Sequence, residues 1–256
     1  MTDQLDALRA SVVRLNAIIE GFDADQLRLQ AYPKEWTVAD VLSHLGSAAV
    51  IMQTRLDAGL AGTDLADDYA QPIWDVWNAK APGARVADSL VAGRALLERF
   101  ESLDESERAR VQYPVGAMTV GFARLVIMRL AEHALHTWDV EVVLDPNATL
   151  PSDAAGFVVE NLAMIVQYTA KPTGTERVVQ IHTVDPSLDL TLSLGTDAAS
   201  LAPSAVPAVP NRVIADLELP TEAFVRLVYG RLDPAHTPPI RGEIDLDELR
   251  QVFPGV

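Results

Sequence analysis

The sequence contains no cysteine, few lysines and few aromatic residues, and it carries far less positive than negative charge. Without cysteine the chain has no disulfide, no cysteine-based zinc or iron–sulfur site and no cysteine nucleophile of its own. Its 20 Lys and Arg residues against 36 Asp and Glu residues give a net charge of -16. A surface of that sign repels nucleic-acid phosphates and anionic lipid headgroups, so we expect no nucleic-acid partner and no membrane partner.

Targeting and membrane-spanning signals are also missing. No stretch approaches the about 18 consecutive apolar residues of a membrane span, and the first residues are acidic instead of basic and apolar. We therefore expect a cytoplasmic protein. The 256 residues, 49% of them hydrophobic, suffice for one large domain or two modest ones. We expect a monomer, because two domains can cover each other's apolar faces.

Apolar residues at spacings of three and four predict long helices in the N-terminal half. Thr37 followed by Asp40 is a capping pair that begins the second helix. The Gly- and Pro-containing stretch 59–83 predicts a long loop with a helical turn, and 103–117 predicts polar turns. The predicted helices span residues 3–21, 38–58, 84–102, 119–144 and 152–169.

The pattern changes near residue 171. Residues 176–184 and 187–194 alternate as two strands of a hairpin joined by Asp185-Pro186, and 212–219 predicts a further strand. The segment 195–210, rich in Ala, Pro and Ser, predicts no element. A helix that begins at 220–222, a short strand around 240 and a helix over 246–252 follow. Helices followed by mixed helices and strands predict two domains, residues 1–170 and 171–256.

The main candidate site combines histidine and glutamate on two of these helices. At helical spacing, Glu132 and His136 lie about 40° apart, and His133 and His136 lie about 60° apart. Either pair presents two ligands to one ion, and the spacing does not choose between them. His44 is the natural third ligand, since the small residues 46–49 beside it admit a close neighbouring helix.

A set of two nitrogens and one oxygen leaves a fourth position open, as a catalytic zinc site requires. Zinc is the leading metal because imidazole suits it, with nickel, iron or manganese as alternatives. A histidine on an amphipathic helix is nevertheless more often a hydrogen-bonded structural residue, and a Glu–His pair four apart is often an ordinary surface pair. Spacing by itself is therefore weak evidence for a metal.

Two longer motifs add to this reading, namely Trp36-Thr-Val-Ala-Asp-Val-Leu-Ser-His44-Leu and Glu132-x3-His136-Thr-Trp-Asp139. They resemble the DinB-like superfamily and, more narrowly, the mycothiol-dependent maleylpyruvate isomerase family. The stretch 220–231, with 240–242, is similar to the end of that family's second domain. The resemblance implies a fold of α plus α/β class, in which a metal-binding DinB-like four-helix bundle precedes a smaller α+β sterol-carrier-like domain.

The resemblance also implies a chemistry. It assigns the metal to His44, Glu132 and His136, which decides against His133. It further implies that a low-molecular-weight thiol, mycothiol, binds the metal as a thiolate. The thiolate would add to an electrophilic small molecule, in an isomerase or an S-transferase reaction. Asp139 is placed to accept the second ring N–H of His136, and an ordinary carboxylate on the helix face is the alternative.

Four further residues are candidates for the same cleft. Arg231 falls on the family's Gly-Arg pair and would orient an anionic group of the thiol or substrate, although a helix-end Arg that complements the dipole is an equal alternative. Arg85 is a second candidate anion contact. Trp74 and Trp77, three apart, would wall the metal cleft, and packing of the loop on the bundle explains them equally well. Since the net charge does not attract anions, such recognition would depend on these arginines.

Two other classes of function stay open. A thiol-independent DinB-like metalloenzyme would keep the bundle and carry out hydrolysis, rearrangement or cyclisation in specialised metabolism. A non-catalytic protein would bind an apolar small molecule in its second domain, with a structural metal or none. Activity without any added thiol would favour the first class, and purified protein without bound metal would favour the second.

Overall fold

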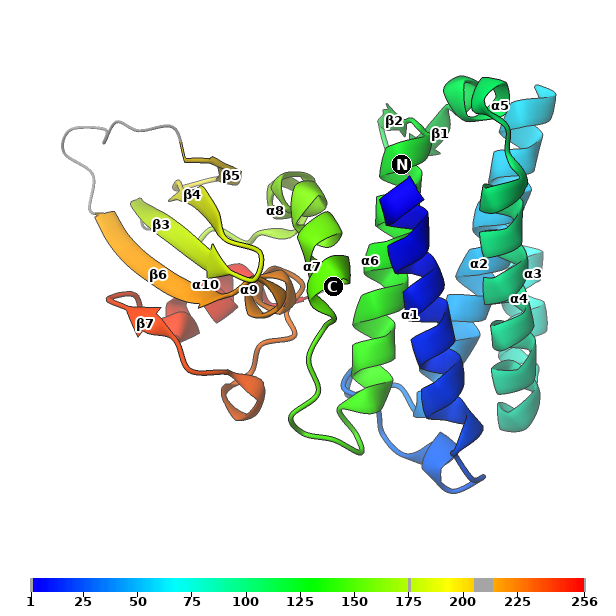
Figure 1. Cartoon of the computed structure of the whole chain (residues 1–256), viewed down its shortest axis with the longest axis horizontal. Coiled ribbons are helices and arrows are strands. Elements are labelled where there is room, and N and C mark those ends of the chain that lie inside the picture. The colour runs from blue at the N-terminus through cyan, green and yellow to red at the C-terminus, as the bar shows by residue number, and fades with distance from the viewer. Residues whose placement is uncertain (1, 175, 205–213, 256) are drawn as a thin grey trace. The chain divides into compact units, whose positions relative to one another are not determined.

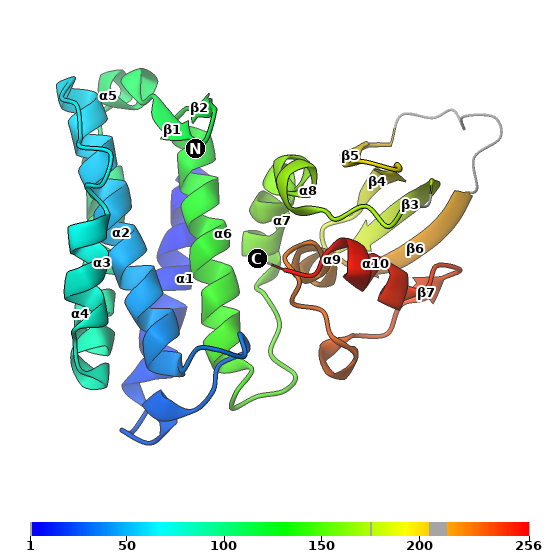
Figure 2. The ribbon, with the colours of Figure 1, turned by 180° about the vertical axis from the view of Figure 1, so that it is seen from behind.

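Contacts divide the chain into two compact units, residues 1–148 and 149–256. The structure is a computed structural model, and it describes residues 2–174, 176–204 and 214–255. In the N-terminal unit the long helices are α1 (Thr2–Glu20), α2 (Val38–Ala61), α4 (Pro82–Ser102) and α6 (Phe122–Glu141). Both α1 and α2 pack on α4 and on α6, and Figures 1 and 2 show the four helices side by side. This closed arrangement is the four-helix bundle that the resemblance implied.

The start of α2 confirms the predicted capping pair. The backbone N–H of Asp40 donates to the Thr37 hydroxyl at 3.2 Å, and the backbone N–H of Thr37 donates to the Asp40 carboxylate at 2.9 Å. Two of the N–H groups at the helix end, which lack partners within the helix, are thereby satisfied. The helix continues to Gly62, whose φ of 68° favours glycine and closes the C-terminal end.

Short elements occupy the segments expected to be loops and turns and the predicted start of the fourth helix. They are α3 (Gln71–Asn78), α5 (Glu105–Arg110), β1 (Tyr113–Val115) and β2 (Met118–Val120). β1 and β2 pair antiparallel around Gly116, whose φ is 56°. Because residues 118–120 form this hairpin, the predicted helix start at 119 is wrong, and α6 begins at Phe122.

The C-terminal unit combines a sheet with short helices, which confirms the predicted mixed class. Its elements are α7 (Ser152–Val158), α8 (Leu162–Thr169), β3 (Arg177–Val184), β4 (Leu188–Leu194), β5 (Ala199–Pro203), β6 (Ile214–Pro220), α9 (Thr221–Val228), β7 (Arg241–Gly242) and α10 (Leu246–Val252). The strand order is β5-β4-β3-β6-β7. The β3–β4 hairpin is as predicted, β3 and β6 are parallel, and the other pairs are antiparallel. On β3, Val179 and Ile181 are buried and alternate with exposed His182.

Several predicted boundaries shift in this unit. The helix expected over 152–169 is interrupted by a 3-10 turn at Val159–Asn161, and β5 forms where no element was expected. Of the strand predicted over 212–219, residues 212 and 213 lie outside the described residues. α8 packs on β5 and α9, and α7 packs on α9. Both helices therefore belong with the sheet, and the division falls after residue 148, ahead of the boundary predicted at 170. Among the described residues, no helix is both long and apolar enough to cross a membrane.

Candidate metal centre

The structure brings His44, Glu132 and His136 together on facing helices of the bundle. His44 comes from α2, and the other two residues lie one turn apart on α6. The Nε2 atom of His44 lies 3.1 Å from Oε2 of Glu132, and Nε2 of His136 lies 3.6 Å from the same oxygen. The three donor atoms all lie within 4.8 Å of one another. No other His, Asp or Glu group in the described part of the chain has this spacing.

These distances suit a divalent metal with nitrogen and oxygen ligands. Zinc binds such donors at about 2.0–2.2 Å in a tetrahedron, which separates neighbouring donors by about 3.4 Å. The two measured separations, 3.1 and 3.6 Å, fall on either side of that value. The side chains of His44 and Glu132 are 36% and 46% exposed, so a small ligand can reach a fourth position. The residues present therefore fit a metal with one open site.

His136 is oriented from behind by a buried carboxylate. Its Nδ1 atom lies 2.7 Å from Oδ2 of Asp139, and Asp139 is 0% exposed. A proton on Nδ1, donated to that carboxylate, leaves Nε2 with a free lone pair directed toward Glu132. This is the tautomer that a metal-binding imidazole requires, and such a partner also makes the ring a stronger donor.

The Glu132 carboxyl is ionised at neutral pH. Partial burial opposes ionisation, but the hydrogen bond to His44 and the electrostatic attraction of both histidines and Arg129 outweigh it and lower the pKa of Glu132 to about 2. A carboxylate held in this form can bind a cation without first losing a proton.

Trp36 is a site residue that the spacing analysis missed. Its ring centroid lies 5.1 Å from that of His44 and 5.9 Å from that of His136, with the second pair stacked. The loop that carries it is closed by a bridge between Gln30 and Thr37. The loop is also tied to α6, because the backbone N–H of Tyr32 donates to the Asp139 carbonyl at 3.1 Å. Trp36 thus gives both imidazoles an apolar wall. The residue is part of the motif that begins at Trp36, but nothing in the sequence indicates that its ring contacts the two histidines.

His133 turns away from the triad into the bundle core. It is 3% exposed, and its Nδ1 atom lies 2.8 Å from the Ser11 hydroxyl on α1. Burial, together with the Arg129 and His136 charges, lowers its pKa well below the usual histidine value. His133 is therefore a neutral core residue that joins α6 to α1, and it does not lie on the bundle surface.

Arg85 and Trp77 hold α3 and α4 against α2. The Arg85 guanidinium donates to the Asp40 carboxylate and, at 2.8 Å, to the Asn78 carbonyl. The Trp77 ring is 5% exposed and lies against Gly46, where an added Cβ would overlap it. Gly46 and His44 are two residues apart, about 200° around the helix. Trp77 therefore packs on the face of α2 opposite His44, which corrects its expected place over the cleft.

The small residues after His44 do allow a close neighbour, as predicted. A Cβ on Gly46 would lie 2.9 Å from Cα of Ser89 on α4, so the neighbour consists of α4 and the Trp77 ring. Trp74 lies on α3, as Trp77 does, and is 46% exposed. Among the described residues, it makes no ring contact with His44 or His136.

Arg231 lies in the C-terminal unit, after α9. It is 9% exposed, and its Nη1 atom donates to the Tyr229 carbonyl at 3.0 Å. Its own carbonyl accepts from Arg226, which forms a two-pronged ion pair with Glu222 at 2.7 and 2.9 Å. These contacts hold the Gly-Arg turn in a fixed shape.

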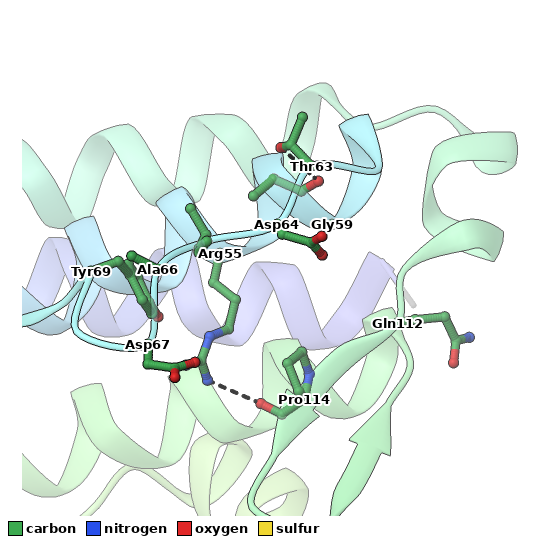
Figure 3. Close-up of a pocket in the computed structure, with 11 residues that line it drawn as sticks. Arg55, Gly59, Thr63, Asp64, Ala66, Asp67, Tyr69, Gln112 and Pro114 are labelled. Atoms are coloured by element: carbon green, nitrogen blue, oxygen red, sulfur yellow. Dashed lines mark hydrogen bonds between the residues drawn. The ribbon is translucent and has the colours of Figure 1, made fainter.

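A hollow of about 360 Å³ lies at the other end of α2 from His44 and holds none of the predicted site residues (Figure 3). Arg55 lies in it, donates to the Pro114 carbonyl at 3.3 Å and contacts the Tyr69 ring. Exposed Asp64 and Asp67 also line it. Their negative charge opposes binding of an anion to Arg55. The hollow is therefore not a candidate site for an anionic substrate.

Fold and donor set together define a four-helix-bundle protein with a candidate divalent-metal site, followed by an α+β unit. A family model described as the mycothiol maleylpyruvate isomerase N-terminal domain matches residues 8–141. That match spans just over half of the chain, and the chain therefore belongs to this family.

Solved structures extend the likeness to both units. The crystal structure of a mycothiol-dependent maleylpyruvate isomerase is 14% identical, with a TM-score of 0.64, and the match covers 93% of this chain and 94% of that chain. A histidine-to-alanine mutant of such an isomerase gives a TM-score of 0.63 at 14% identity, over 90% of this chain and 89% of that chain. At this identity the likeness shows the fold. A search of curated proteins finds no match.

Proposed function

We propose that this chain is a metal- and mycothiol-dependent enzyme that isomerises a small electrophilic substrate of the maleylpyruvate type. The observation that carries the proposal is the His44–Glu132–His136 cluster, whose donors suit a divalent metal. Family membership and the names of the similar solved structures support the thiol and the isomerase reaction. Transfer of the thiol to an acceptor is the second outcome that the same site would support.

Each residue of the site has a defined task in this proposal. His44, Glu132 and His136 would hold the metal, with zinc as the leading ion. Asp139 fixes the His136 tautomer through the 2.7 Å contact, and Trp36 limits the freedom of both rings and excludes water from one side. When bound, the metal would lower the pKa of a thiol at its open position and so supply a thiolate at neutral pH.

The thiol has to come from outside the chain, because the sequence contains no cysteine. This requirement distinguishes the proposed enzyme from one that stores its nucleophile in a side chain. Addition of a thiolate to a conjugated double bond makes that bond single and free to rotate, and elimination then returns the thiol. Arg231 is proposed to orient an anionic group of the thiol or substrate. Arg85 already donates to Asp40, so we leave it out of this role.

The test is elemental analysis of purified protein combined with calorimetric titration of mycothiol, with and without a chelator. We expect about one divalent metal per chain, lost in His44→Ala and in His136→Ala, and thiol binding that disappears with the metal. His182→Ala, a substitution on an exposed strand position, is the matched control and should keep the metal. Full metal retention in both site variants would refute the assignment.

The same elemental analysis, combined with an activity assay without added thiol, separates the other classes. Stoichiometric metal with catalytic turnover and no added thiol would favour a thiol-independent metalloenzyme, and purified protein without metal would favour a binding protein. Maleylpyruvate isomerisation with mycothiol, followed as isomer conversion, distinguishes the isomerase from a transferase, because only the transferase consumes the thiol.

A further inference from the structure

Arg129 is a fully buried cation beside the candidate metal site. It lies on α6, three residues before Glu132, which is about 4.5 Å along the helix axis, and it is 2% exposed. Its Nη2 atom donates to the Leu45 carbonyl at 3.2 Å. Leu45 directly follows His44 on α2, so this one side chain reaches from one ligand-bearing helix to the other.

The guanidinium has fewer hydrogen bonds and counter-charges than a buried charge ordinarily needs. Its Nη1 atom is buried without a hydrogen-bond partner, and no carboxylate lies within 4.0 Å of it among the described residues. Burial lowers the pKa of Arg129 to about 10, partly opposed by the Glu132 charge, so the group is still positively charged at neutral pH. Burying an unpaired charge is costly, and an apolar residue would fill the same space at lower cost.

A count of formal charges indicates what this cation favours. The count takes Glu132 as negative, Asp139 as the negative carboxylate that accepts from Nδ1 of His136, and Arg129 as positive. With a divalent metal, the three residues leave one net positive charge, which a singly charged fourth ligand neutralises. Without Arg129 the same set is neutral, and an anionic ligand would leave a net negative charge in a partly desolvated site.

We propose that Arg129 is a positioning residue whose buried charge makes the metal prefer an anionic ligand, such as a thiolate, over a neutral one. This inference rests on the proposed function, because it requires a metal on the triad. Its action passes through the field at the site, since the side chain itself is too buried to touch a ligand. The hydrogen bond to the Leu45 carbonyl fixes the position of the guanidinium relative to the two helices.

The experiment uses full-length protein loaded with Co²⁺, whose visible spectrum reports the coordination of the metal. The probe that binds as an anion is 2-mercaptoethanol, which releases its thiol proton to the buffer on binding and is followed by the sulfur-to-cobalt charge-transfer band. The probe that binds as a neutral ligand is imidazole. Both are titrated at pH 7 into wild-type protein and three variants. Arg129→Met removes charge and hydrogen bonds, Arg129→Gln removes the charge and keeps a donor for Leu45, and Arg129→Lys keeps the charge.

We expect Arg129→Met and Arg129→Gln to bind the thiol about tenfold to a hundredfold more weakly, the loss expected for one buried charge near the ligand. Imidazole affinity should change by less than about threefold, and Arg129→Lys should recover most of the thiol affinity. Arg124→Met, at an exposed arginine of the same helix, controls for net charge and should match wild type.

Other outcomes overturn the inference in distinguishable ways. If the affinities for both probes fall equally, or if glutamine but not lysine restores the thiol affinity, Arg129 acts only through its hydrogen bond to the Leu45 carbonyl. Unchanged thiol affinity in the neutral variants would also refute it, while the metal site stands. If Arg129→Met does not fold, the glutamine and lysine variants decide the question. If wild-type protein takes up no Co²⁺, the proposed function fails first and this inference fails with it.

Discussion

Asp139→Asn tests the orientation of His136 with the smallest chemical change. The carboxylate accepts a hydrogen bond from Nδ1 of His136 at 2.7 Å and is 0% exposed, so water cannot replace it. An asparagine amide can instead donate to Nδ1. The imidazole proton then moves to Nε2, the atom that faces Glu132, and blocks the lone pair that a metal would need.

The expected cost follows from this exchange of tautomers. Loss of such a hydrogen-bonded partner typically weakens metal binding about 10- to 100-fold, which corresponds to about 1.4–2.7 kcal/mol. The assay is competition for Zn²⁺ between the protein and a chromophoric chelator at neutral pH. Thermal unfolding of the chelator-treated proteins shows separately whether the variant folds.

Asp68→Asn, at an exposed position between α2 and α3, is the matched control and should leave the Zn²⁺ affinity unchanged. An Asp139→Asn variant that folds and binds Zn²⁺ within twofold of wild type would refute the reasoning. It would mean either that the tautomer of His136 is set elsewhere or that His136 does not bind the metal.

Three further predictions concern stability, measured by urea unfolding of chelator-treated protein. The free energy of unfolding should fall as the pH drops below about 6.5, because the unfolded chain takes up a proton at His133 that the buried, lowered-pKa ring does not. His133→Gln should reduce the dependence of the unfolding free energy on pH by at most ~1.4 kcal/mol per pH unit. An unaltered pH dependence would contradict the conclusion that His133 is neutral in the folded protein. Gly46→Ala should cost about 1–3 kcal/mol by overlap with the Trp77 ring; a stability equal to wild type would show that this packing is loose. Thr37→Val should cost about 1 kcal/mol through loss of the cap, whereas Thr37→Ser should keep most of it.

Features that depend on neighbouring residues could be predicted from the sequence. The capping pair at Thr37 and Asp40 and the relation of Glu132 to His136 follow from a helical period that repeats every few residues. The β3–β4 hairpin likewise follows from alternation and a turn. Where two local preferences compete, the prediction failed, as at residues 119 and 120, which pair with β1 instead of extending α6.

The choice between Glu132 and His133 illustrates the limit of local reasoning. Both residues lie at helical spacing from His136, and only the packing of α6 between α1 and α2 separates their surroundings. His133 meets Ser11 on α1, whereas Glu132 meets His44 on α2. The resemblance to a known family also favoured Glu132, but the helical spacing by itself could not distinguish it from His133.

By itself, then, the sequence determined the long helices of the first half, the β3–β4 hairpin, the absence of a cysteine nucleophile and the two alternative donor pairs on α6. Tertiary structure decided that His44 completes the cluster, that Trp36 covers its rings, that Trp77 packs on the opposite face of α2, and that Arg129 is buried without a carboxylate partner. The physical reason is the same in each case. Backbone hydrogen bonds and side-chain periodicity act over a few residues, whereas burial and charge environment depend on which distant helices pack together.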